Sequence, residues 1–104
     1  MGSIELDSAA AAYATAWLLY DGGTAYGQTP ENYPSHEGLT DDQASYVRGA
    51  VGAGKRAAQA RRDGDMPRME FYRESFVRQK RFIVGRGVLS NATMESLYSM
   101  GYKA

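Results

Sequence analysis

Large aliphatic side chains are scarce in this 104-residue chain, and their scarcity limits what it can fold into. Hydrophobic residues make up 43% of the sequence, but 15 of them are alanine and eight are tyrosine, whereas leucine, isoleucine, valine and phenylalanine together number 16. Alanine fills a core only where two backbones approach closely. We therefore expect a single domain over residues 1–104 with one thin core, which also favours homo-oligomerisation or ordering by a partner.

Helix-favouring stretches alternate with helix-breaking residues along the chain. The predicted helices cover about residues 8–20, 41–62, 67–84 and 91–101. A capping box at Thr40 and Gln43 opens the second, and Pro67 suits the first position of the third. Ser90 caps the last helix, whose apolar residues predict a face docked on the core. The sequence thus predicts an all-α fold, a small bundle of three main helices plus a short C-terminal helix.

One long loop is predicted at about residues 21–39, where Gly, Pro, Asn and Ser recur without a period. A loop of this length is usually functional or disordered, although its tyrosines could instead pack over the small core. Aromatic and acidic residues in and just after it form one candidate surface for a partner protein: Tyr26, Tyr33, Glu31, Glu37, Asp41 and Asp42.

The net charge of zero is the sum of two opposite halves. Residues 1–47 hold seven acidic and no basic residues, a net charge of −7. Residues 48–104 hold all 12 basic residues and five acidic ones, a net charge of +7. A polyanionic partner is therefore compatible with the chain, and so is head-to-tail self-association of the two halves.

Two basic surfaces are predicted in the C-terminal half. Arg48, Lys55 and Arg62 fall on one face of the second helix, at a spacing that suits successive phosphates. On the third helix, Phe71 and Phe82 point away from the core stripe. They lie beside three arginines, Arg68, Arg78 and Arg86. Such rings could stack on bases or anchor a protein interface, whereas the alternatives are a solvated basic face and rings sandwiched between helices.

A glycine-rich stretch, Gly49–Arg56, resembles the phosphate-loop pattern but has Arg56 where that motif needs a hydroxyl. It also falls inside a predicted helix. We expect Gly49, Gly52 and Ala53 to allow close approach of another helix, or the helix to break near residues 49–54. The chain has no cysteine and one histidine, so no metal site, cofactor or catalytic constellation is predicted.

Two functions follow from these patterns. The first is a small non-catalytic protein whose basic half contacts the nucleic acid backbone. The second is a regulatory or inhibitory protein that binds a partner protein, such as a nucleic-acid-associated one, through its acidic and aromatic surfaces. No apolar run reaches the roughly 18 residues of a membrane span, and a cytoplasmic location is the default expectation.

Overall fold

The computed structural model describes residues 3–21 and 34–104, and this part of the chain is all-α, as predicted. It contains α1 (Ser3–Asp21), α2 (Asp41–Arg62), α3 (Met66–Gly85) and α4 (Asn91–Lys103). The helix boundaries agree closely with the prediction except that α1 begins earlier, at Ser3. Most of the predicted long loop, including Tyr26, Glu31 and Tyr33, lies outside the described residues.

Side-chain caps start three of the helices. The capping box of α2 is confirmed: the backbone N–H of Gln43 donates to Thr40 Oγ1 at 3.0 Å, and the side-chain Oε1 of Gln43 accepts from the backbone N–H of Thr40 at 2.9 Å. Ser90 caps α4 by accepting from the Thr93 amide at 3.1 Å. Asp65 caps α3 in the same way, just before Pro67. These caps satisfy N–H groups that the first helical turn leaves without partners.

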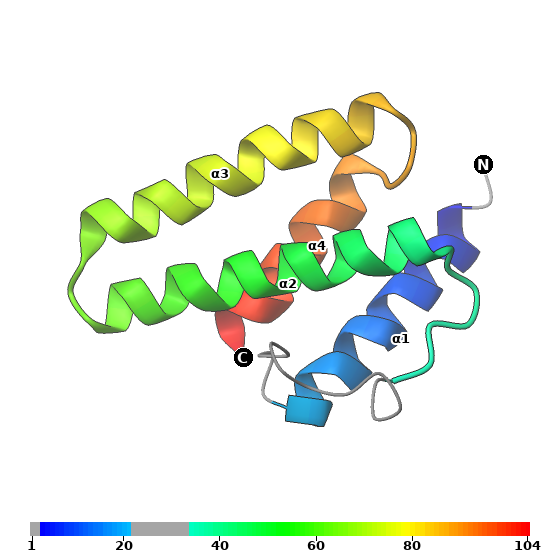
Figure 1. Cartoon of the computed structure of the whole chain (residues 1–104), viewed down its shortest axis with the longest axis horizontal. Coiled ribbons are helices and arrows are strands. Elements are labelled where there is room, and N and C mark those ends of the chain that lie inside the picture. The colour runs from blue at the N-terminus through cyan, green and yellow to red at the C-terminus, as the bar shows by residue number, and fades with distance from the viewer. Residues whose placement is uncertain (1–2, 22–33) are drawn as a thin grey trace.

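The α2 helix is central to the fold, because it contacts each of the other three helices. The α2 and α3 helices run antiparallel, joined by the short turn at residues 63–65 (Figure 1). The α4 helix packs against both of them, and α1 lies against α2 and α4. One side of α3 therefore packs on the rest of the fold while the other is left outward.

The core combines an alanine-lined face of α2 with a few large side chains. The buried alanines of α2 are Ala44, Ala50, Ala57, Ala58 and Ala60. The largest fully buried side chains are Phe76, Ile83, Met94, Leu97, Val47 and Val51. The α1 helix adds Tyr13 and Trp17, each only 3% exposed. The predicted docked face of α4 is confirmed by its buried Met94, Leu97 and Tyr98.

Two backbones approach closely where α2 crosses α4. A Cβ atom added to Gly54 would overlap the Tyr98 carbonyl oxygen and lie 2.8 Å from the Tyr102 amide nitrogen. One added to Gly101 would overlap the Val51 carbonyl oxygen. The expectation that Gly49 and Gly52 serve this role is wrong. A Cβ at Gly49 would meet nothing within 4 Å, and the nearest group to one at Gly52 is the Arg56 side chain of the same helix, at 3.4 Å.

The glycine-rich stretch of α2 is helical throughout, so the predicted break near residues 49–54 is also wrong. The reason is that this part of α2 is held by the helices packed around it. Its backbone N–H groups are used within the helix, so they cannot cradle a phosphate as a phosphate loop does.

A three-residue ion cluster ties α3 to α4. The Glu95 carboxylate of α4 accepts from Arg73 at 3.1 Å and from Lys80 at 2.5 Å. The Arg73 guanidinium also lies 4.8 Å from the centre of the Tyr98 ring. Burial alone would raise the pKa of the Glu95 carboxyl, but the bonds and charges of Lys80 and Arg73 outweigh it and hold that pKa below its usual range.

Acid should remove the contribution of this cluster to stability. A carboxyl whose pKa is lowered by folding stabilises the folded state above its unfolded pKa, about 4.3 for Glu, and this contribution is lost as the pH falls through the lower folded value. We expect Glu95→Gln to lower the free energy of unfolding more at pH 7 than at pH 3, measured by urea denaturation. Glu70→Gln, at an exposed carboxylate of α3, is the control. An equal loss for Glu95→Gln at both pH values would contradict the assignment.

Candidate functional site

The outward side of α3 carries two large exposed rings. Phe71 and Phe82 are 59% and 53% exposed, so neither is sandwiched between helices of this fold. They are eleven residues apart, which places them about 16 Å apart along the helix and on nearly the same line. Because aromatic side chains are enriched in binding surfaces, two exposed rings on one line of a helix are candidates for contact with a ligand or partner.

Three arginines lie on the same side of α3. At about 100° per residue, Arg68, Arg78 and Arg86 fall within about 60° of the two rings around the helix. Each is exposed. We call these five residues the α3 outer stripe: Arg68, Phe71, Arg78, Phe82 and Arg86. The structure therefore brings together all the site residues predicted for α3.

The three arginines of the stripe have different surroundings. The Arg86 guanidinium carbon lies 4.3 Å from the centre of the Phe82 ring. Arg68 pairs with Asp65, the cap of its own helix, at 3.3 Å. Among the described residues, Arg78 has no acidic group within ion-pair distance. Because exposed ion pairs are weak, none of these contacts prevents the arginines from binding an anion.

Two other basic residues of α3 are used inside the fold, whereas Arg81 is exposed. Arg73 and Lys80 point toward Glu95 of α4, on the side of α3 that packs against the bundle. Glu70 stands three residues before Arg73 on the same helix, at a spacing typical of helix ion pairs, but the partner of Arg73 is Glu95. Arg73 and Lys80 are therefore neutralised on the inner side of α3, while the arginines of the outer stripe are left exposed.

The predicted basic line on α2 is only partly present. Arg48 donates to the Tyr13 hydroxyl at 2.8 Å, and its guanidinium carbon lies 5.4 Å from the centre of the Trp17 ring. Arg48 contacts α1, which packs over this side of α2, so it is set apart from the open face of α2 on which Arg62 lies. Its role as a phosphate ligand stays a prediction. Lys55 is half-buried, and Arg62 is exposed and bonded to Gln59.

A shallow groove of about 100 Å³ lies between α2 and α3, beside the stripe. Arg56 and Gln59 of α2 line it together with Arg68 and Tyr72 of α3. The prediction missed Arg56, which lies one residue from Lys55 along α2. Helical rotation of about 100° per residue turns it toward α3, and only the packing of the two helices shows that this side is the relevant one.

The surface predicted for a partner protein has three acidic residues within the described part of the chain, and they lie near the start of α2. Glu37, Asp41 and Asp42 are exposed, and Asp41 pairs with His36 Nε2 at 2.9 Å. Within residues 3–21 and 34–104, no three such side chains gather closely enough to hold a metal ion.

Comparison of the chain with protein-family models, with curated proteins and with solved structures gave no match. None of the helices in the described part of the chain combines the length and the apolar character needed to cross a membrane. Function is therefore inferred from the chemistry of the exposed side chains.

Proposed function

We propose that the protein binds single-stranded nucleic acid, without acting on it as an enzyme, through the α3 outer stripe. The observation that carries this proposal is the alternation of exposed Phe71 and Phe82 with exposed arginines along one side of a helix. Arginine pairs with phosphate, and phenylalanine stacks on bases of any sequence. Stacking needs an unpaired base face, which favours a single strand over a duplex.

The length of the stripe sets the size of the site. Phe71 and Phe82 are about 16 Å apart, and phosphates follow one another about every 3.4 Å along a stacked strand. About five nucleotides therefore separate bases stacked on the two rings. Arg78 lies between the rings, where it can meet the backbone that joins those bases.

Fluorescence anisotropy of a labelled single strand of about 12 nucleotides tests this function directly. If the three arginines each contact one phosphate, log affinity should fall against log salt with a slope of about −2, since each contact contributes about −0.7. Arg78→Gln should reduce the magnitude of the slope by about 0.7. Lys103→Gln, which removes one exposed cation from α4, should leave it unchanged. Absence of binding at low salt would overturn the proposal.

The alternative proposal is that this molecule binds a partner protein instead of nucleic acid. Exposed Glu37, Asp41 and Asp42 would then form part of its contact surface. A pull-down tests this alternative. Recovery of one stoichiometric partner that is unaffected by nuclease, and that is lost on charge reversal at Asp41 and Asp42, would show that the ligand is a protein and not nucleic acid.

A further inference from the structure

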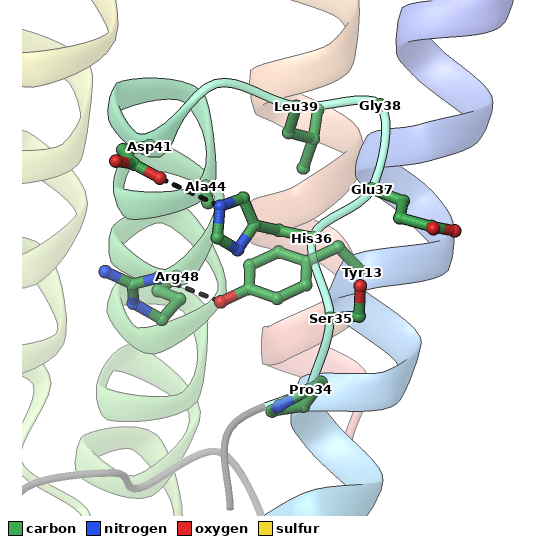
Figure 2. Close-up of a pocket in the computed structure, with 10 residues that line it drawn as sticks. All are labelled: Tyr13, Pro34, Ser35, His36, Glu37, Gly38, Leu39, Asp41, Ala44 and Arg48. Carbon is green, nitrogen blue, oxygen red and sulfur yellow. Dashed lines mark hydrogen bonds and ion pairs between the residues drawn. The ribbon is translucent and has the colours of Figure 1, made fainter. Parts of the chain in front are cut away.

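A hollow of about 700 Å³ lies between α1, the segment 34–39 and the first two turns of α2 (Figure 2). Its volume is in the range of small-molecule sites, roughly 300 to 1,000 Å³. Polar side chains line it in two bonded pairs, Tyr13 with Arg48 and His36 with Asp41. Figure 2 shows the His36 ring between Asp41 and the Tyr13 ring, with the Arg48 guanidinium beside the Tyr13 hydroxyl. We call this hollow the Arg48 pocket.

Within the part of the chain that the structure describes, the Arg48 pocket contains hydrogen-bond donors without a protein acceptor. A guanidinium carries five N–H donors, and Arg48 donates one of them, from Nη1, to the Tyr13 hydroxyl. The Tyr13 hydroxyl accepts that bond, so its own hydrogen remains available to a ligand. The Tyr13 ring is buried and the Arg48 guanidinium lies over Trp17, so both groups are held in place before a ligand arrives.

The charges around the pocket favour an anion at Arg48. Asp41 is bonded to His36 and its side chain is 96% exposed, so water screens it. Glu37 also lines the hollow, but its side chain is exposed and its carboxylate extends away from the Arg48 guanidinium (Figure 2). Leu39 and Ala44 supply apolar lining beside the Tyr13 and His36 rings, whose centres are 6.0 Å apart.

We infer that the Arg48 pocket binds a small organic anion, a carboxylate or a phosphate monoester with an apolar body. Its charged group pairs with the guanidinium of Arg48 and accepts a hydrogen bond from the Tyr13 hydroxyl. The apolar body lies against Leu39 and the two rings. The His36–Asp41 bond holds the segment 34–39 in place as one wall of the site. This inference does not depend on the proposed function, because none of these residues belongs to the α3 outer stripe.

Titration of the ¹⁵N-labelled protein, followed by NMR, tests the site with three probes of similar shape: benzoate, phenyl phosphate and neutral benzamide. We expect saturable shifts of amides in segment 34–39 and around Tyr13 and Arg48 with at least one of the two anions. A response to benzoate alone assigns a carboxylate ligand, and one to phenyl phosphate alone assigns a phosphate ester. Shifts from benzamide as large as those from the anions, or no saturable shift, would overturn the inference.

Three variants separate the roles in this site. Arg48→Gln should weaken anion binding at least about 10-fold, because it removes a charged bidentate partner. Tyr13→Phe keeps the buried ring and removes only the hydroxyl, so it should weaken binding by about 2- to 10-fold. Arg78→Gln, on the α3 outer stripe, should leave anion binding unchanged. If Arg48→Gln fails to fold, unchanged affinity in Tyr13→Phe would still contradict the inference.

Discussion

Alanine at Gly54 should lower the free energy of unfolding by on the order of 3 kcal/mol, the upper part of the range for overpacked cores. The added methyl group would overlap the carbonyl oxygen of Tyr98, which is backbone and cannot rotate away. The α2 and α4 helices would have to separate, and the buried contacts of Val51 and Leu97 would loosen with them. Urea denaturation followed by circular dichroism measures the loss.

Gly49→Ala is the matched control, in the same helix and with the same change of side chain. Because nothing lies within 4 Å of a Cβ at this position, the better helix propensity of alanine should stabilise the protein by about 1 kcal/mol. Opposite signs for the two variants would locate the helix crossing at Gly54. Equal effects would mean that the two helices are not in backbone contact there.

Replacing both Phe71 and Phe82 with alanine should weaken the binding of a single strand at least about 30-fold. Each stacked ring contributes about 1–3 kcal/mol, and each 1.4 kcal/mol corresponds to a factor of ten. Both rings are more than half exposed, so the double variant should remain folded. The measurement is fluorescence anisotropy at fixed low salt, with the thermal unfolding midpoint recorded for each variant.

Leu19→Ala provides the control for this experiment. Leu19 is 82% exposed on α1, outside the α3 outer stripe, and its loss removes an exposed apolar side chain of comparable size. We expect its affinity to equal that of the wild type. If the double phenylalanine variant also binds like the wild type, the strand does not stack on α3, and charge alone holds it.

Local signals in the sequence account for most of the fold. The capping box at Thr40, the Asp65 and Ser90 caps and the spacing of apolar residues are short-range features, and they place α2, α3 and α4 within a few residues. The start of α1 was missed because Asp7 and Ser8 are capping-type residues and favour a later start, whereas the helix runs through them from Ser3. Helical periodicity placed Phe71 and Phe82 opposite the core stripe, but it left open whether another helix covers them, and the structure shows that both are exposed.

Long-range packing could not be predicted in this way. Gly49, Gly52 and Gly54 look alike in sequence, and only the path of α4 makes Gly54 the point of contact. Arg48 has the spacing of a phosphate ligand, but α1 covers its side of α2 and engages it. Arg73 had a nearby partner in sequence, yet Glu95 of α4 binds it, because ion pairs depend on which helices meet.

The alanine-lined face of α2 has a thermodynamic consequence for so small a protein. A buried alanine has no rotamers to lose, whereas ordering a leucine or isoleucine side chain costs about 0.5–1 kcal/mol of conformational entropy. Each of the five buried alanines of α2 therefore contributes contact area without that cost. A core that is poor in large side chains is also one whose side chains lose little freedom on folding, and this offsets part of its thinness.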